Sequence, residues 1–307
     1  MYICGIDGGG TKTKIVIANL NAEEIDSIIV GPSSIDTVSI DESIDIINYG
    51  IEVMMTNNNL QGKIVSLFAG LGGISSSKDI EIVNSKLKQN MYLSEKAIVN
   101  CANDVENAWY SGCDGRASIT LIVGTGSVAY GVDEKGKAWR AGGISFLEGD
   151  YGSSYDLALR SLKYLAKVFD NRIESTPYME YLKEELSIKS LKDLILVFEK
   201  YVSKRTELAN YAKLVTKWAI KGDKIALRIV DEGARELVSM VKTVDRNIEL
   251  LNKEVSIIGT LGNFNSPYKT EIYKKIREYN HKFLIHENEV CPSIGAVKLA
   301  KYYLNNH

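Results

Sequence analysis

The sequence predicts a duplicated α/β fold, in which one chain carries two copies of the same strand-and-helix unit. Near residue 2 an apolar strand runs into a glycine-rich turn and then into a second strand, and the same order recurs near residue 118. Around both copies, short β-branched runs alternate with helical patterns, which is typical of α/β proteins. A long helical block at about residues 153–251 follows the second copy.

In the first copy, apolar runs that end at glycine or polar residues predict strands at Tyr2–Asp7, Lys14–Leu20, Ile64–Phe68 and Ala97–Asn100. A second glycine-rich turn is expected at Gly70–Gly73, after the third of these strands. The spacing of apolar residues predicts helices at Asp79–Gln89 and from about Val105.

In the second copy, the same reasoning predicts strands at Ile119–Val123, Val128–Val132 and Ala138–Arg140, with tight turns at Gly124–Ser127 and Asp133–Gly136 between them. The segment Val255–Phe264 is expected to be a strand followed by a glycine turn, and Tyr268–Tyr279 a helix. Pro292 and Ser293 open a final helix, in which Gly295 allows the close approach of another element.

Composition excludes several classes of protein. The 307 residues are 45% hydrophobic and 25% charged with a net charge of −2, so neither nucleic acid nor a membrane surface is an expected partner. No apolar run approaches the roughly 20 residues of a membrane helix, and the N-terminus lacks a signal-peptide pattern, so we expect a cytoplasmic protein.

Cysteine and histidine contribute little to the expected chemistry. The four cysteines form no C-x-x-C pair, which favours reduced, buried thiols over a metal or redox site. The three histidines all lie near the C-terminus, at His281, His286 and His307. Chemistry in the first 280 residues must therefore rest on carboxylates, lysines, hydroxyls and backbone amides.

The segment GIDGGGTKTK, Gly5–Lys14, has the composition of a phosphate-binding turn but matches neither common helical type. In a P-loop, lysine follows the last glycine, whereas here Thr11 takes that place and Lys12 comes one residue late. The dinucleotide fingerprint G-x-G-x-x-G also fails, and both motifs must open a helix. The residues that follow, KIVIA, favour a strand.

A glycine hairpin that wraps phosphates with its backbone amides remains as the interpretation. Thr11 and Thr13 can add hydroxyl donors, and Lys12 a positive charge. Asp7, at the end of the preceding strand, would face Mg²⁺ through water. The alternative is a plain glycine hairpin without a ligand, and the second turn GTGS at Gly124–Ser127 counts against that alternative.

Six motifs, taken in order, resemble one known family: GIDGGGTKT, NCANDVENAWYSG, LIVGTGSVAYG, AGGISFLEGDYGSSYDL, IIGTLGNF and PSIGAVKLA. The sequence resembles the N-acetylglucosamine kinase-like group, of the BadF/BadG/BcrA/BcrD ATPase type, in the superfamily of sugar kinases, heat-shock ATPases and actin. The resemblance implies two ribonuclease H-like (actin-like ATPase) domains with an ATP cleft between them. It implies an N-terminal domain of residues 1–114 plus 291–307, and a C-terminal domain of residues 115–290 with a helical insertion.

The same resemblance implies how ATP is bound. One phosphate loop would use Gly9, Gly10, Thr11, Lys12 and Thr13, and the other Gly124, Thr125, Gly126 and Ser127. Gly259, Gly262 and Asn263 would flank the adenosine, and Ala209, in the helix LANYAKLV, would line the adenine pocket. Mg²⁺ would be the metal cofactor, beside Asp7.

For the sugar, the resemblance assigns the role of general base or orienting group to Asp104. Local sequence alone favours another interpretation, in which Asp104 only caps the helix that follows. The other residues that the resemblance places at the sugar are Ser33, Ser34, Gly72, Gly142, Gly143, Ile144 and Asp150.

Three departures from the family pattern bear on the substrate. Ser34 stands where the family commonly has Asn, Ile144 where it has Trp, and Tyr151 where it has Glu. The loss of the Trp predicts a wider acceptor pocket, which admits N-acetylmuramate or glucosamine as well as N-acetylglucosamine. The family also implies transfer to the 6-hydroxyl, in amino-sugar or cell-wall salvage, by a homodimer.

Other functions remain open at this point. An ATPase activator of a 2-hydroxyacyl-CoA dehydratase or benzoyl-CoA reductase has the same fold and holds a [4Fe–4S] cluster with two cysteines per subunit. Cys101 and Cys113 do not stand in the glycine-rich context that such a site needs. A sugar sensor without catalysis would carry an N-terminal helix-turn-helix, for which the strand at Tyr2 leaves no room. The third alternative is a polymerising actin-like protein, which the helical insertion weakly disfavours.

Overall fold

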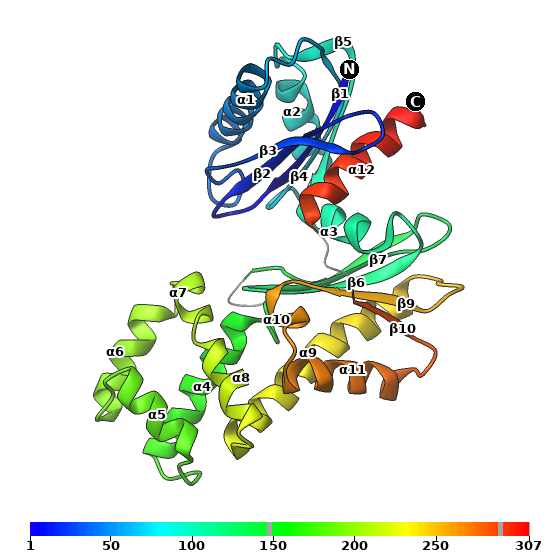
Figure 1. Cartoon of the computed structure of the whole chain (residues 1–307). Coiled ribbons are helices and arrows are strands. Elements are labelled where there is room, and N and C mark those ends of the chain that lie inside the picture. Colours follow the sequence, from blue (N-terminus) through cyan, green and yellow to red (C-terminus); the bar gives the residue numbers. More distant parts are fainter. Residues whose placement is uncertain (146–148, 288–290, 307) are drawn as a thin grey trace. The chain divides into compact units, whose positions relative to one another are not determined.

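The computed structural model describes the chain except for residues 146–148, 288–290 and 307. The protein divides into two compact units (Figure 1). One comprises Met1–Arg116 with Glu289–His307, and the other Ala117–Asn288. Each unit is built on its own five-stranded mixed sheet.

The sheet of the first unit has the strand order β3-β2-β1-β4-β5. Its strands are β1 (Tyr2–Gly8), β2 (Thr13–Ala18), β3 (Glu24–Val30), β4 (Ile64–Leu71) and β5 (Leu93–Asn103). The first three form an antiparallel meander, whereas β4 pairs parallel with both β1 and β5. The carboxyl ends of β1, β4 and β5 therefore lie at one edge of this sheet.

Helices cover both faces of this sheet. On one face, α1 (Ile40–Asn57) and α2 (Ser77–Leu87) bury their apolar sides against one set of strand residues, and both begin with a capping box, at Ser39 and Ser76. On the other face, α12 (Pro292–Asn305) packs on β1 and β4 and on α3 (Asp104–Cys113). Neighbouring residues such as Ile3 and Cys4 belong to opposite faces, as the alternation of a strand requires.

The sheet of the second unit repeats this topology, with the order β10-β9-β6-β7-β8. Its strands are β6 (Ser118–Val123), β7 (Ser127–Val132), β8 (Ala138–Gly142), β9 (Glu254–Ile258) and β10 (Leu284–Glu287). The first three again form an antiparallel meander, and β9 again pairs parallel with the first strand, β6, and with β10. The predicted duplicated α/β fold is confirmed.

Helices between β8 and β9 fill the predicted helical block: α4 (Ser154–Phe169), α5 (Pro177–Glu185), α6 (Leu191–Tyr201), α7 (Arg205–Ala209), α8 (Ala212–Ile220) and α9 (Lys224–Asn247). Two further helices, α10 (Thr260–Asn263) and α11 (Pro267–Tyr279), follow β9. The long helix α9 packs along the sheet and against α11, and together with α4 it forms the centre of the core of this unit.

The structure corrects several element predictions. The strands β3 and β10 and the helix α1 were not predicted, and α2 begins and ends two residues before the predicted bounds of Asp79–Gln89. The predicted glycine turn after β9 contains the short helix α10, which begins after Gly259 with its φ of +96°. The segment LANYAKLV is broken between α7 and α8 at Asn210 and Tyr211 instead of forming one helix.

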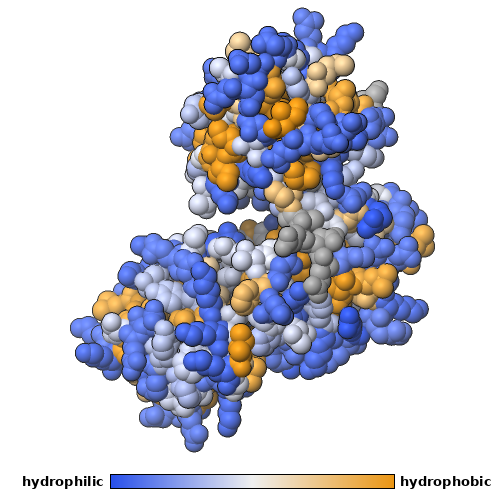
Figure 2. Space-filling model, in the orientation of Figure 1, coloured by the Kyte–Doolittle hydropathy of each residue, from blue (hydrophilic) through white to orange (hydrophobic). Residues whose placement is uncertain are grey.

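Within the described residues, the structure holds no helix whose length and apolar character would let it cross a bilayer. Figure 2 shows that hydrophilic residues dominate the visible face of each unit, with smaller hydrophobic patches between them.

Candidate functional site

The glycine turn between β1 and β2 is held by its own backbone and by the segment after β3. The Gly9 amide donates to the Lys12 carbonyl at 3.1 Å, and the Gly9 carbonyl accepts from the amides of Ser33 and Ser34, both at 3.2 Å. Gly10, Thr11 and Lys12 are exposed at the tip. An exposed turn with glycine, threonine and lysine at its tip is suited to an anion.

Two hydroxyls that were predicted to meet ligands are turned inward. Thr13 is fully buried, and its hydroxyl donates to the Gly31 carbonyl at 2.8 Å or to the Ser33 hydroxyl at 2.7 Å. Ser33 is equally buried, and its carbonyl accepts from the Ser43 hydroxyl at 2.7 Å. In this structure both residues hold the turn in place, and the contacts expected of Thr13 with phosphate and of Ser33 with sugar stay predictions.

Asp7 lies at the carboxyl end of β1, half-buried, with an amide partner from the next helix. The Nδ2 group of Asn107, on α3, donates to Asp7 Oδ1 at 3.1 Å and to the Ile6 carbonyl at 3.0 Å. Burial raises the pKa of Asp7 to about 6, against the lowering effects of Asn107 and of Lys12 and Lys14. A cation beside this carboxylate would relieve that cost of burial.

Asp104 is the first residue of α3, and Asn103, not Asp104, caps this helix. The side-chain oxygen of Asn103 accepts from the Val105 amide at 3.3 Å, so the interpretation of Asp104 as a simple helix cap is wrong. A Cβ atom on Gly72 would stand 3.6 Å from Asp104 Oδ2 and 2.7 Å from the Ser34 hydroxyl. Glycine at residue 72 therefore lets Ser34 pack close to the backbone beside Asp104.

In the second unit, the turn Gly124–Gly126 is joined to the first residues of α4, and Ser127 to the segment before α4. The amides of Ser154 and Tyr155 donate to the carbonyls of Gly124 and Thr125, at 2.9 and 3.3 Å. The hydroxyl of Ser127, predicted to contact phosphate, instead donates to the Tyr151 carbonyl at 2.7 Å. The amides of Thr125 and Gly126 have no acceptor among the residues that the structure describes, which leaves them available to an anion.

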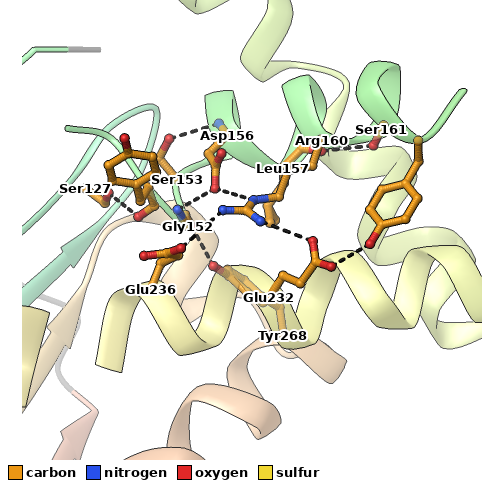
Figure 3. Close-up of polar contacts among 12 residues, drawn as sticks. Ser127, Gly152, Ser153, Asp156, Leu157, Arg160, Ser161, Glu232, Glu236 and Tyr268 are labelled. Atoms are coloured by element: carbon orange, nitrogen blue, oxygen red, sulfur yellow. Dashed lines mark hydrogen bonds and ion pairs between the residues drawn. The ribbon is translucent and has the colours of Figure 1, made fainter. Parts of the chain in front are cut away.

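A half-buried arginine holds the segment around Gly152 (Figure 3). Arg160, on α4, lies 2.7 Å from Asp156 Oδ2, 3.1 Å from Glu232 Oε2 and 3.6 Å from Glu236 Oε1. The same Asp156 oxygen accepts from the Gly152 amide at 2.8 Å, and the Tyr268 hydroxyl donates to the Gly152 carbonyl at 2.5 Å. The position of this segment, and of the turn bonded to it, thus depends on α4, α9 and α11.

Asp150, predicted to bind sugar, is buried and paired with an arginine. One carboxylate oxygen accepts from the Ser127 amide at 3.1 Å, and the other lies 2.6 Å from Nη2 of Arg205, on α7. Burial raises the pKa of Asp150, and the Arg205 guanidinium opposes that rise. The same guanidinium lies against Gly126, at the position that a Cβ atom there would take.

The neighbouring residues predicted at the sugar differ in exposure. Gly142 and Gly143 have φ values of +78° and +63°, which favour glycine, and the Gly143 amide donates to the Gly149 carbonyl at 3.2 Å. Ile144 is 83% exposed and Tyr151 46% exposed. Both departures from the family pattern therefore lie at the surface of the second unit.

A largely apolar pocket of about 760 Å³ opens beside the Gly124–Gly126 turn. It is lined by Gly124, Thr125, Ser154, Thr206, Ala209, Asn210, Ala212, Lys213, Thr216, Lys217, Ile220, Lys221, Thr260, Leu261 and Phe264. Predicted residue Ala209 is thus in the wall, on α7, although the helix assumed for it is broken. A pocket of this size, with few polar groups, has the usual character of a small-molecule site.

Three residues predicted to flank adenosine do not line this pocket themselves. Gly262 is buried, and a Cβ atom there would stand 2.8 Å from Ile257 on β9. A Cβ atom on Gly259 would come within 2.5 Å of the Val123 carbonyl. These glycines let α10 lie close to the sheet, so that its Thr260 and Leu261, instead of Gly259, Gly262 and Asn263, reach the pocket.

Sequence reasoning missed three residues that organise these sites: Asn107, Arg160 and Arg205. Asn107 stands one turn after Asp104 on α3, so helical spacing could have identified it. Arg160 and Arg205 meet their partners only through tertiary packing, and nothing local marks them.

The structure also bears on metal binding and on the reactivity of the cysteine thiols. In the part of the chain that the structure describes, no group of three or more His, Cys, Asp or Glu residues is arranged to hold a metal ion. Cys4, Cys101 and Cys113 are buried, and burial raises the pKa of Cys4 and of Cys101 to about 12. Such thiols remain protonated, whereas the thiolate is the metal ligand.

Comparisons with known proteins agree with this arrangement. The model of the BadF/BadG/BcrA/BcrD ATPase family matches residues 4–300. The chain is 31% identical over 311 residues to a protein of Clostridium acetobutylicum named N-acetylmuramic acid/N-acetylglucosamine kinase, with 98% of each chain covered. It is 28% identical over 309 residues to the N-acetyl-D-glucosamine kinase of Dictyostelium discoideum, with 96% of each covered.

Solved structures show the same fold at lower identity. A crystal structure from Chromobacterium violaceum, described as an N-acetylglucosamine kinase, matches with a TM-score of 0.75 and 19% identity, over 97% of this chain and 98% of that one. A glucokinase of the ROK family from Streptomyces griseus, solved with glucose and AMPPNP, matches with a TM-score of 0.58 and 15% identity, over 98% and 99%. At these identities the likeness concerns the fold.

Proposed function

The chain belongs to the BadF/BadG/BcrA/BcrD ATPase family, and we propose that it is an ATP-dependent amino-sugar kinase. The observation that carries this proposal is the similarity, over 98% of both chains, to an N-acetylmuramic acid/N-acetylglucosamine kinase. The pocket beside the Gly124–Gly126 turn supports it, since this apolar cavity lies next to the Thr125 and Gly126 amides, which have no acceptor among the described residues. Adenosine suits the cavity and phosphates suit the amides.

Phosphoryl transfer needs positioned phosphates, an oriented acceptor and neutralised charge. In this proposal the turns at Gly9–Lys12 and Gly124–Gly126 bind the phosphates. Asp104, which lies near Gly72, accepts the proton of the sugar hydroxyl. The hydroxyl oxygen forms a bond to the γ-phosphorus, the bond from that phosphorus to the β,γ-bridging oxygen breaks, and ADP leaves.

Mg²⁺ fits the residues around Asp7. A half-buried carboxylate with a raised pKa is stabilised by a cation, and Mg²⁺ commonly uses one or two carboxylates, waters and substrate phosphates. Asp7 would hold the ion through its carboxylate, and Asn107 would orient that carboxylate. When bound, the ion would neutralise charge on the phosphates.

For the acceptor, we propose N-acetylglucosamine together with N-acetylmuramate or glucosamine, with transfer to the 6-hydroxyl, in amino-sugar salvage. Exposed Ile144, in place of a tryptophan, supports a wide pocket that accommodates the lactyl ether of N-acetylmuramate. The name of the Clostridium relative, which includes both N-acetylated sugars, also supports this choice.

We further propose a cytoplasmic homodimer, which sedimentation velocity would test. Four cysteines without a disulfide suit a reducing compartment. A groove of about 440 Å³ between β3 and α1 is lined largely by apolar residues, among them Ile29 and Tyr49, which are 60% and 61% exposed. Exposed apolar surface on an edge strand supports association with another chain.

A sugar panel tests the proposed function. Release of ADP from ATP and Mg²⁺ is measured with N-acetylglucosamine, N-acetylmuramate, glucosamine and glucose, and without sugar. We expect release to depend on an amino sugar, with N-acetylmuramate turned over as well as N-acetylglucosamine. Strict preference for N-acetylglucosamine would contradict the proposal of a wide acceptor pocket. Equal ATP hydrolysis without sugar would contradict the proposed kinase function.

A further inference from the structure

The ion pair of Asp150 and Arg205 links a residue expected at the sugar to a helix of the proposed nucleotide pocket. Asp150 is 4% exposed and lies in the segment expected at the sugar. Arg205 begins α7, the helix whose Thr206 and Ala209 line the proposed nucleotide pocket. An arginine on a helix that lines the nucleotide pocket thus pairs with a carboxylate expected to bind the sugar.

The guanidinium also lies against the phosphate-binding turn. A Cβ atom on Gly126 would overlap Nη2 of Arg205, and it would stand 2.7 Å from Asp150 Oδ1. The carboxylate, the guanidinium and the turn therefore share one small volume. A triphosphate bound to the Thr125 and Gly126 amides would bring its negative charge into the reach of Arg205.

The pair is incompletely satisfied as it stands. Buried Nε of Arg205 has no acceptor among the residues that the structure describes. The Arg205 side chain is also 41% exposed, so it can turn toward the pocket without crossing packed core. Phosphate oxygens offer an arginine several acceptors in the geometry that its planar fork prefers.

We propose that Arg205 is a positioning residue that exchanges Asp150 for the phosphates of ATP. With no nucleotide bound, Arg205 neutralises Asp150 and weakens its interaction with sugar hydroxyls. When ATP binds, Arg205 turns to the β- and γ-phosphates, and Asp150 is released to accept from the sugar. Because binding free energies are coupled reciprocally, ATP tightens sugar binding and sugar tightens ATP binding by the same factor.

This inference rests on the proposed kinase function, but part of its test does not require a sugar. Calorimetry with adenosine and with AMP-PNP plus Mg²⁺ compares wild type, Arg205→Gln, Arg205→Lys and Lys204→Gln. Lys204 is the matched control, because it is a neighbouring cation that pairs with exposed Glu207, at 3.1 Å.

We expect Arg205→Gln to weaken AMP-PNP at least tenfold and to leave adenosine unchanged, with Arg205→Lys in between and Lys204→Gln like wild type. Equal weakening of both ligands would mean that Arg205 only supports the pocket, and unchanged AMP-PNP binding would mean that it does not meet the phosphates. Either result overturns the proposal.

The second part measures binding of N-acetylglucosamine with and without AMP-PNP. In wild type the nucleotide should tighten sugar binding at least fivefold. Arg205→Gln should bind sugar more tightly than wild type in the absence of nucleotide, and the nucleotide should add little. If the nucleotide tightens sugar binding in Arg205→Gln as much as in wild type, Arg205 does not exchange Asp150 for phosphate. If wild type binds no amino sugar even with AMP-PNP, the proposed function fails, while the nucleotide titrations still decide the role of Arg205.

Discussion

At the scale of single residues, the most informative side chain is Asp7, because its burial disfavours the charge that its proposed role needs. Burial raises its pKa to about 6, so the folded protein favours the protonated form more than the unfolded chain does. Such a group lowers stability progressively as the pH rises from about 4 to about 6, and the cost persists above that range.

Asp7→Asn should therefore separate stability from activity. We expect the variant to unfold at a higher temperature than wild type at pH 7.5 and at the same temperature at pH 4, where wild-type Asp7 is protonated. Its kcat/KM should fall at least about 100-fold, because the proposed metal ligand is lost. Thermal unfolding at both pH values and ADP release measure the two effects.

Glu106 provides the control for this prediction. Burial also raises the pKa of this α3 carboxyl to about 6, but we assign it no role in the reaction. Glu106→Gln should show the same gain in stability at pH 7.5 and keep its activity. If Asp7→Asn remains active as well, Asp7 does not hold the metal.

At the scale of elements, the contacts of Arg160 hold the segment to which the Gly124–Gly126 turn is bonded. This side chain, 18% exposed, links α4 to two carboxylates of α9 and, through Asp156, to the Gly152 amide (Figure 3). Removing one member of a partly buried ion network leaves the other charges uncompensated. The loss should therefore reach the Gly124–Gly126 turn, which is bonded to the same segment.

Arg160→Met should lower the free energy of unfolding by roughly 1–3 kcal/mol and weaken AMP-PNP binding. Arg235→Met is the matched control, since Arg235 also pairs with an aspartate four residues earlier, at 2.9 Å, but is 70% exposed. We expect it to cost less than about 0.5 kcal/mol. Urea unfolding and calorimetry provide the measurements, and equal effects of the two substitutions would refute the role of Arg160.

Also at this scale, the sequence predicted the elements whose patterns are local. Alternating or wholly apolar runs identified the buried strands β1, β4, β6, β7 and β9, all close to their observed bounds. Strand β3 was missed because its residues EIDSIIV are half exposed at a sheet edge, where neither alternation nor burial is marked. Helix α1 has a capping box at Ser39 and Glu42 and could have been identified from it.

At the scale of the whole molecule, the repeated glycine hairpin predicted the duplication, and the two sheets confirm it with one shared strand order. Site geometry was less predictable. The sequence identified Gly126 and Asp150, but Arg205, which touches both, lies 55 residues beyond Asp150. Contacts between such distant elements arise from packing, which local patterns do not record.

The measurement that tests the account most directly is ADP release by wild type and Asp104→Asn, with and without N-acetylglucosamine or N-acetylmuramate. Asn keeps the size of Asp104 but cannot accept the proton, so kcat should fall about 100- to 10,000-fold, while AMP-PNP affinity stays within about twofold. ADP release by wild type should require an amino sugar, and Asp104→Asn should nearly abolish this release. Near-normal kcat in Asp104→Asn, or wild-type ATP hydrolysis that ignores the sugar, would contradict it.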